Sequence, residues 1–149
     1  MRIYIILLLL SLTTYSQVKQ SSIEMRSDVG GTVDIPIKLN NVLNIKFIVD
    51  TGASESSIPL YIVNTLIKTE TILIEDKLED KTYLLANGST STSRRVRLRK
   101  VKIGDFILED VAFSVSDDVR SPLLIGQNIL TQFKSVKFDY VNSRLIITK

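Results

Sequence analysis

The sequence of 149 residues contains neither cysteine nor histidine. The absence of cysteine excludes disulfide bonds, thiol nucleophiles, thiolate metal sites and a lipoprotein anchor on a cysteine. The absence of histidine excludes Ser-His-Asp and Cys-His catalytic groups and zinc sites of the histidine type. The chemistry that remains is carboxylate chemistry, and the sequence predicts neither a metal nor a cofactor.

The net charge of the chain is also small. The formal net charge is +3, which is too small to indicate nucleic-acid binding by itself. One segment nevertheless carries a basic cluster: Arg94, Arg95, Arg97, Arg99, Lys100 and Lys102. Such a cluster is either a surface for an anionic partner or the solvated face of a strand. Alternation with Val96 and Leu98 favours a solvated face neutralised by the acidic residues Glu75, Asp76, Glu79 and Asp80, so no nucleic-acid partner is expected.

The chain has no apolar run of the ~20 residues that a membrane-spanning helix needs. Its N-terminus has Arg2, an apolar stretch at residues 3–10, and the small residues Thr14 and Ser16 at positions −3 and −1 of a cleavage site. This pattern is typical of a secretory signal peptide, here residues 1–16. We therefore expect export to the periplasm or the exterior, with no stable membrane span after cleavage.

Residues 17–149 are enough for one domain with a core and too few for a duplicated, two-lobed protein. Alternating apolar and polar residues at 33–39 and 43–49 predict a β-hairpin. Further strand-like segments lie at residues 71–74, 82–86, 96–103, 106–115, 136–140 and 145–148. One short helix is expected near the C-terminus, at residues 127–133, while residues 57–66 fit either a helix or an irregular turn. The fold class predicted is mostly β, a closed single-domain barrel.

One predicted strand changes its alternation midway. Val96 and Leu98 set one parity, whereas Val101 and Ile103 set the other, so we expect a bulge or a bend between them. The polar stretch at residues 87–93 comes just before this strand and predicts a hairpin loop.

The most informative stretch is residues 47–54, Phe-Ile-Val-Asp-Thr-Gly-Ala-Ser. An apolar strand ends at Asp50, and Gly52 allows a tight turn in which backbone N–H groups approach the carboxylate. The alternative is an ordinary turn in which Asp50 caps its own loop. Peptide hydrolysis by carboxylates needs two of them, one ionised to activate water and one protonated to polarise the carbonyl. Because the chain has one Asp-Thr-Gly, the simplest second carboxylate is Asp50 of a second copy across a two-fold axis.

Residues 50–54 and the later Leu-Ile-Gly-Gln-Asn-Ile-Leu at 124–130 together resemble the retropepsin-like aspartic peptidases, both the retroviral enzymes and their single-domain bacterial relatives. In that family an apolar-apolar-Gly segment crosses beneath the Asp-Thr-Gly loop, and a short helix follows it. Gly52 and Gly126 lie 74 residues apart, which leaves room for a flap hairpin between them. The resemblance implies a homodimeric aspartic endopeptidase, acting on peptides or proteins without a metal or cofactor, with an acid protease fold.

The resemblance also implies roles for single residues. Asp50 would be the catalytic acid, Thr51 would hydrogen-bond across the dimer axis, and Gly52 would let its backbone approach the carboxylates. Ala53 is similar to the retroviral pattern at this position. The hairpin around residues 87–93 would be the flap that covers bound peptide.

An extended peptide would be held as an added strand. The substrate-binding residues expected from the resemblance are Ile48, Asn87, Gly88 and Ile125. Residues 145–148 and the mature N-terminal segment are the candidates for the sheet that joins the two subunits.

Two positions depart from the retroviral pattern. An Asp two residues after the first Gly and an Arg after the second usually form an ion pair near the dimer interface, whereas this chain has Ser54 and Gln127. A neutral hydrogen bond can replace the pair without leaving a buried charge unpaired, but the dimer strength is then open. The alternative function is a non-catalytic peptide-binding or dimerisation module of the same fold, against which the intact Asp-Thr-Gly argues.

Overall fold

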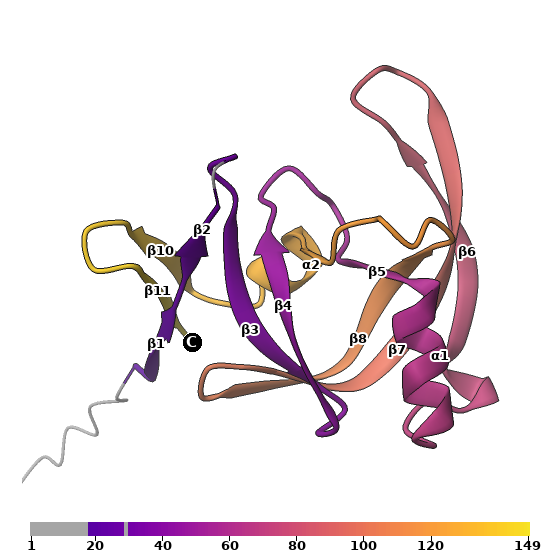
Figure 1. The fold of residues 1–149 in the computed structure, drawn as a ribbon, viewed down its shortest axis with the longest axis horizontal. Coiled ribbons are helices and arrows are strands. Elements are labelled where there is room, and N and C mark those ends of the chain that lie inside the picture. The colour runs from indigo at the N-terminus through magenta and orange to yellow at the C-terminus, as the bar shows by residue number, and fades with distance from the viewer. Residues whose placement is uncertain (1–17, 29) are drawn as a thin grey trace, which may run out of the picture.

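The computed structural model describes residues 18–28 and 30–149, so the predicted signal peptide lies outside the described residues. Figure 1 shows a twisted barrel with a small sheet on one side and a long hairpin on the other. The strands are β1 (Gln20–Glu24), β2 (Arg26–Ser27), β3 (Val33–Leu39), β4 (Leu43–Val49), β5 (Ser57–Pro59), β6 (Lys77–Leu84), β7 (Thr90–Ile103), β8 (Phe106–Ser116), β9 (Leu124–Ile125), β10 (Ser135–Asp139) and β11 (Arg144–Thr148). The helices are α1 (Leu60–Lys68), the 3-10 turn η1 (Ile74–Asp76) and α2 (Gln127–Leu130).

The large sheet closes on itself, as the sequence predicts. Its strand order is β2-β3-β4-β9-β5-β8-β7-β6, and an additional pairing of β3 with β7 joins the two ends of the ring. Ile37 pairs with Ile103 and Leu39 with Val101 at this closure. The short β2 and the outer β6 extend the sheet beyond the ring.

The predicted hairpin of β3 and β4 is confirmed and leads directly into the Asp50 turn. Asn40 and Asn41 turn the chain with φ of 44° and 63°, a left-handed conformation that asparagine tolerates better than most residues. Pro36 lies between the part of β3 that pairs with β2 and the part that pairs with β7. A residue without an N–H group is tolerated there because no second neighbour needs its hydrogen bond.

The predicted change of parity in β7 is a bend without an inserted residue. The pairing with β8 keeps one register from end to end, with Leu98 opposite Val111 and Lys100 opposite Glu109. Both strands expose two successive residues at this point, and Asp110 has φ of 53°. The two strands therefore switch their inward faces together, which bends the hairpin around the core.

The described residues contain α1 as well as α2. The open alternative for residues 57–66 is therefore settled as a helix preceded by β5, and the fold has two short helices. One expected strand is wrong. Residues 71–74 are not a strand, whereas the charged segment after them is β6. Because β6 lies at the sheet edge in a hairpin that projects from the barrel, it buries neither face and shows no alternation. Residues 82–84 fall within the strand predicted at 82–86, whereas the charged composition of residues 77–81 gave no strand pattern.

The core fills the barrel and continues beneath α1. Phe47 and Phe113 are fully buried at its centre, with ring centroids 6.1 Å apart. Helix α1 contributes Ile62, Val63 and Leu66 from one face. In the part of the chain that the structure describes, neither helix is long and apolar enough to cross a membrane.

A second, three-stranded sheet has the order β1-β11-β10. The predicted C-terminal hairpin of β10 and β11 is confirmed, and β1 adds to it from the N-terminal side. Since β11 is paired along both edges within one chain, its edges are not available to a second subunit. Strand β11 therefore offers no free edge of its own, and the role of this sheet in joining two subunits remains a prediction.

Candidate active site

Strand pairing fixes the place of Asp50 at the end of the barrel. Strand β4 runs parallel to the short β9, with Val49 opposite Ile125. The Asp50 N–H donates to the Ile125 carbonyl oxygen at 2.9 Å, and the Ile48 N–H donates to that of Leu123 at 2.9 Å. The catalytic candidate is therefore anchored by the backbone of the segment that the sequence analysis associated with it.

The turn after Asp50 wraps around its carboxylate. The N–H groups of Gly52 and Ala53 donate to Asp50 Oδ1 at 2.8 and 3.2 Å. A Cβ atom at Gly52 would lie 3.3 Å from the same oxygen, so a side chain there would crowd the carboxylate. Asp50 itself is half-buried, whereas Thr51 and Gly52 are exposed. The turn orients one carboxylate and leaves the Thr51 side open.

Gly126 lies directly beneath this turn. A Cβ atom at position 126 would come within 2.7 Å of the Ala53 carbonyl oxygen and 2.8 Å of the Glu55 carbonyl carbon. The Gly126 N–H donates to Ser56 Oγ at 3.0 Å. Glycine is required at position 126 because only a residue without a side chain allows this close approach.

Ser56 and Asn128 complete the support, and the sequence analysis did not single them out as site residues. Asn128 Oδ1 accepts from both the N–H and the hydroxyl of Ser56, at 2.8 Å each. Asn128 Nδ2 donates to the Ala112 carbonyl oxygen at 2.8 Å. Asn128 lies inside the segment 124–130 quoted above, and a polar side chain that is withdrawn from solvent needs a hydrogen-bond partner. Asn128 was therefore the residue from which this pair could have been inferred.

Neutral hydrogen bonds are found where the retroviral pattern has an ion pair, at Ser54 and Gln127. Gln127 Nε2 donates to the Thr51 carbonyl oxygen at 2.6 Å. The backbone N–H of Asn128 donates to the Ser54 carbonyl oxygen at 3.3 Å. The amide of Gln127 thus fixes the Thr51 backbone, and the Ser54 side chain is not its partner.

A buried ionic cluster that the sequence analysis missed links the Asp50 loop to the β6–β7 hairpin. The Glu55 side chain is 3% exposed. Arg95 donates to Glu55 Oε1 from Nε at 2.9 Å and from Nη2 at 2.7 Å. Tyr83 donates its hydroxyl to Glu55 Oε2, and Lys81 Nζ lies 3.5 Å from that oxygen. Both strands of the hairpin are therefore fixed to the loop.

These contacts shift the pKa of Glu55 and that of Tyr83. Burial alone would raise the pKa of Glu55, but the Tyr83 hydrogen bond and the Arg95 guanidinium outweigh it and lower that pKa. Burial and the neighbouring Glu55 carboxylate raise the pKa of the Tyr83 hydroxyl far above its ordinary value. Glu55 is therefore ionised and Tyr83 is protonated at neutral pH.

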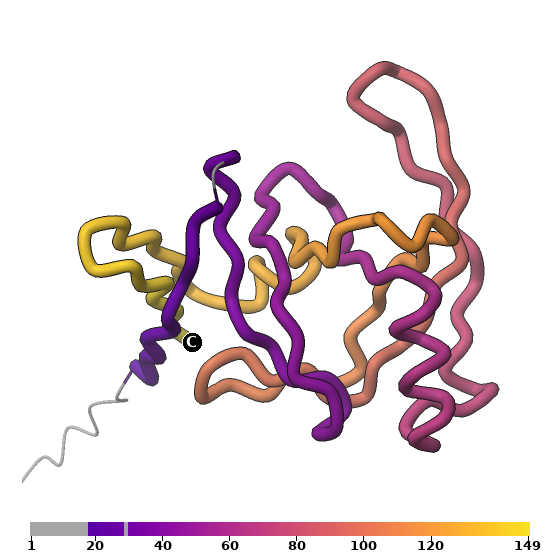
Figure 2. Tube along the Cα trace, viewed as in Figure 1, coloured from indigo at the N-terminus to yellow at the C-terminus, as the bar shows by residue number. Residues whose placement is uncertain are grey.

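The hairpin of β6 and β7 projects well beyond the barrel (Figure 2). Asn87 and Gly88 are exposed at its tip, and Gly88 has φ of +82°. The loop is shorter than the predicted residues 87–93, because β7 begins at Thr90. The tip is closed by a hydrogen bond from the Leu85 N–H to the Ser89 carbonyl oxygen at 2.8 Å. Leu84 and Leu85 are 76% and 44% exposed. The hairpin thus carries unpaired apolar side chains that suit contact with a bound chain.

The two predicted apolar subsite residues differ in exposure. Ile48 is half-buried on β4, next to Asp50. Ile125 is fully buried in the core, so its side chain supports the site from below and does not face a substrate in this chain. A groove of about 500 Å³ between α1 and the base of the hairpin is lined by residues such as Leu60, Ile72 and Val96, and it does not reach the Asp50 turn.

The basic cluster of β7 is largely paired with carboxylates. Its contacts are Arg94 with Asp117, Arg95 with Glu55, Arg97 with Asp76 and Asp110, and Arg99 with Glu75 and Asp76. The expected neutralisation by Glu75 and Asp76 is therefore observed. Asp76 is completely enclosed, which makes this part of the cluster a structural element of the fold.

Similarity to solved structures agrees with this geometry. A retropepsin-like aspartic protease from Rickettsia conorii is 23% identical, covers 89% of this chain and 91% of its own, and superposes with a TM-score of 0.60. EIAV protease complexed with the inhibitor HBY-793 is 14% identical, covers 72% of this chain and 92% of its own, and has a TM-score of 0.51. At these identities the likeness concerns the fold. No curated protein matches the chain.

A family model identifies the family from the sequence. Residues 35–132 match the family model described as "gag-polyprotein putative aspartyl protease". The matched region is more than half of the chain, and it includes both the Asp50 turn and α2. The protein therefore belongs to the retropepsin-like aspartyl protease family.

Proposed function

We propose that the protein is an exported, homodimeric aspartic endopeptidase. The observation that carries the proposal is the Asp50 carboxylate, held at the end of a strand by two N–H groups and supported from below by Gly126. One chain supplies one such carboxylate in an Asp-Thr-Gly context. Two copies supply the pair that the chemistry requires.

The two Asp50 carboxyl groups share one proton. The ionised one removes a proton from a water molecule as its oxygen attacks the scissile carbonyl carbon, and the protonated one gives its proton to the carbonyl oxygen. The carboxyl group that took the proton from water then gives it to the amide nitrogen as the C–N bond breaks, and the other carboxylate takes back a proton from a hydroxyl of the tetrahedral intermediate, which restores the shared proton. Thr51, Gly52 and Ala53 orient the carboxylates and take no part in the proton transfers.

The substrate is an extended peptide or protein segment. Ile48 lies next to Asp50, while Asn87 and Gly88 lie at the tip of the hairpin that would cover the bound chain. Exposed Leu84 and Leu85 add apolar surface on that hairpin. A peptide enclosed between the hairpin and the Asp50 turns is held by main-chain hydrogen bonds and is shielded from water.

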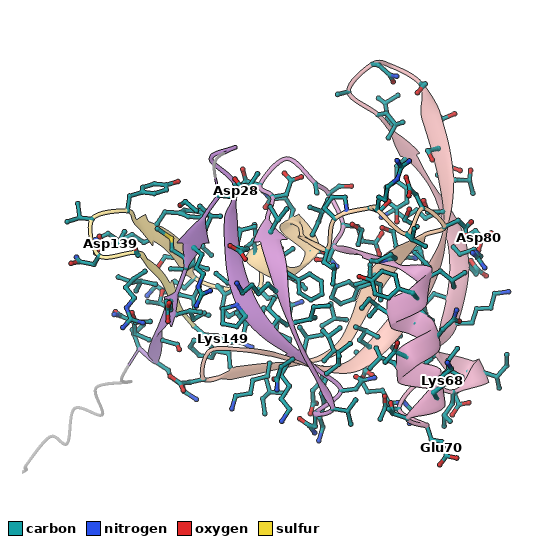
Figure 3. The ribbon with its side chains drawn as sticks, viewed as in Figure 1. Asp28, Lys68, Glu70, Asp80, Asp139 and Lys149 are labelled. Atoms are coloured by element: carbon teal, nitrogen blue, oxygen red, sulfur yellow. The ribbon has the colours of Figure 1, made fainter. Side chains whose placement is uncertain are left out.

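The direct test is cleavage of a diverse peptide library by the purified protein from acidic to neutral pH. Asp50→Asn should abolish cleavage, whereas Asp80→Asn should not, because Asp80 lies on the exposed outer part of β6 (Figure 3). Cleavage that persists in Asp50→Asn would refute the proposal. Binding without cleavage by the wild-type protein would favour the non-catalytic peptide-binding module.

Export rests on the N-terminal pattern of the sequence. The purified protein from an expressing cell should begin at Gln17, because Thr14 and Ser16 suit the positions before a signal peptidase cut. N-terminal sequencing of the envelope and culture fractions measures this. A protein that retains Met1 and stays in the cytoplasmic fraction would contradict export.

A further inference from the structure

We infer that the groove between α1 and the base of the β6–β7 hairpin, called the α1 groove below, binds a single-chain anionic amphiphile, an acyl chain that ends in a carboxylate. Its volume is about 500 Å³, within the ~300–1,000 Å³ typical of small-molecule sites. None of its lining residues belongs to the Asp50 turn or to the hairpin tip. The inference therefore goes beyond the proposed function and does not need it.

Helix α1 and the large sheet form the two walls of the α1 groove. The helix lies beside β6, β7 and β8 (Figure 1) and contributes Leu60, Val63 and Ile67, while the sheet contributes Val96 and Val115. Val63, Val96 and Val115 are between 4% and 8% exposed, so they form the bottom of the groove. A ligand in the groove therefore rests on the apolar core of the domain.

The rim of the α1 groove is apolar as well. Ile67 is 50% exposed, Leu73 is 44% exposed and Ile74 is 86% exposed, and all three line the groove. Apolar side chains that gather in this way around a hollow, instead of lying singly on the surface, are typical of a binding site. An apolar ligand would remove them from water.

The polar groups of the α1 groove are too few for a peptide. Among the described residues its lining includes one amide side chain, Asn64, and the edge strand β6 enters the lining only at Lys77. A bound peptide brings an N–H and a C=O group with nearly every residue, and each needs a partner. An acyl chain brings none along its length, so the lining favours an acyl chain.

The charge of the lining is positive throughout. Lys77, Arg94 and Arg95 line the α1 groove, and no carboxylate of the described residues does. Arg94 and Arg95 are paired with Asp117 and Glu55. Lys77 has no ion pair within the part of the chain that the structure describes. Its ammonium group is therefore available to an anionic head group.

Strand pairing brings two of these cations together beside the apolar bottom. Lys77 lies opposite Val96 in the β6–β7 ladder, and opposite residues of an antiparallel pair share one face of the sheet. Arg94 lies two residues before Val96 on β7, so it shares that face too. A carboxylate placed between Lys77 and Arg94 leaves its acyl chain over Val96, which is the arrangement that an anionic amphiphile requires.

The test is a titration of the purified, ¹⁵N-labelled protein with decanoate at neutral pH, followed by amide chemical shifts. Decanoate should bind saturably, with the largest shifts in α1 and at residues 72–77. Octanoate should bind about tenfold more weakly, because it buries two fewer methylene groups. Decan-1-ol, which has the same chain without the charge, should bind more weakly than decanoate.

A variant that fills the α1 groove tests its location. Asn64→Trp places a ring where the acyl chain would lie, and it should weaken decanoate binding at least about tenfold, since the buried methylene groups lose their place. Thr65→Trp is the matched control, because Thr65 is also exposed on α1 but does not line the groove. Both variants should remain folded by circular dichroism, and equal decanoate affinities would overturn the inference.

A second variant tests the head group. Lys77→Gln should weaken decanoate binding about threefold to fivefold, the effect of one exposed ion pair, and it should leave decan-1-ol unaffected. Lys68→Gln is the control, because Lys68 ends α1 outside the lining (Figure 3). Equal effects of the two variants on decanoate would overturn the assignment of the anionic head to Lys77.

Other occupants would give different results, and each would overturn the inference. Phosphatidylglycerol vesicles that bind the protein while free decanoate does not would assign this face to a membrane surface. An apolar peptide that shifts the α1 amides while decanoate does not would assign it to a protein partner. Amide shifts in α1 that change on dilution of the protein alone, with no response to decanoate, would assign it to a second copy.

Discussion

The phenolic hydroxyl of Tyr83 donates a hydrogen bond to the buried carboxylate of Glu55. Tyr83 belongs to the projecting hairpin, and Glu55 belongs to the loop that begins at Asp50. A contact between the projecting hairpin and the Asp50 loop couples the position of one to the shape of the other. The hairpin is thus tied to the Asp50 loop through Tyr83 on β6 and Arg95 on β7.

Tyr83→Phe should loosen the hairpin without unfolding the protein. The change leaves Glu55 Oε2 without its hydroxyl donor, and an unmade bond to a buried acceptor costs about 1–3 kcal/mol of unfolding free energy. Amide hydrogen exchange in β6 should accelerate. Thr82→Val is the control, because it removes an exposed cross-strand hydroxyl bond from the same hairpin. Exchange rates in β6 that are equal in the two variants would contradict the tether.

The Glu55 cluster should give a specific pH dependence of stability. Its folded pKa is lowered, so the stabilisation is complete above the ordinary glutamate pKa of about 4.3 and is lost as pH falls through the lower folded pKa. Denaturant unfolding measured from about pH 5 to pH 3 should show a steeper loss of stability in wild type than in Glu55→Gln. Parallel curves would show that Glu55 does not contribute.

Gly126→Ala should displace the Asp50 loop. The new methyl group would meet the Ala53 carbonyl oxygen at 2.7 Å, and overpacking of this kind costs about 1–3 kcal/mol. The thermal unfolding temperature and the rate of peptide cleavage should both fall. Gly30→Ala is the control, since the nearest atom to its new methyl group is a side-chain oxygen of Asp28 at 3.3 Å. Wild-type activity in Gly126→Ala would show that the loop does not depend on this close approach.

Asp76→Asn should destabilise the fold far from the catalytic turn. Asp76 is fully enclosed and accepts from Arg97 and Arg99, so an amide here sets an NH₂ donor against donors in a buried position, at a cost of about 1–3 kcal/mol. Asp110→Asn is the matched control, because Asp110 is an exposed partner of the same Arg97 and should change stability by less than about 1 kcal/mol. Urea midpoints measure both, and similar midpoints would contradict the difference.

The parts of the site that could be predicted are those in which a local sequence pattern specifies the local backbone structure. The alternation in β3 and β4 gives the hairpin, and the apolar strand before Asp50 gives the turn. Gly126 was identified through the family resemblance, and the structure gives the physical reason, a close backbone approach to Ala53 and Glu55. The roles of Asp50 and Thr51 in catalysis and dimerisation remain predictions, since they depend on a second copy.

The rest depends on contacts between distant residues. Glu55 and Arg95 lie 40 positions apart, and the sequence around either residue does not identify the other as its partner. The first part of β6, residues 77–81, was missed because a hairpin in solvent buries no face and therefore shows no alternation. The β1-β11-β10 sheet joins both ends of the chain, so its order was not visible from strand patterns alone.

The central claim is that two Asp50 carboxylates, one from each subunit, form one site. The most direct measurement mixes wild-type and Asp50→Asn chains at constant total concentration, after dissociation and reassembly, and follows peptide cleavage. Activity should fall as the square of the wild-type fraction, because a mixed dimer has one carboxylate and cannot do both jobs. Activity that falls in direct proportion to the wild-type fraction would contradict the shared site.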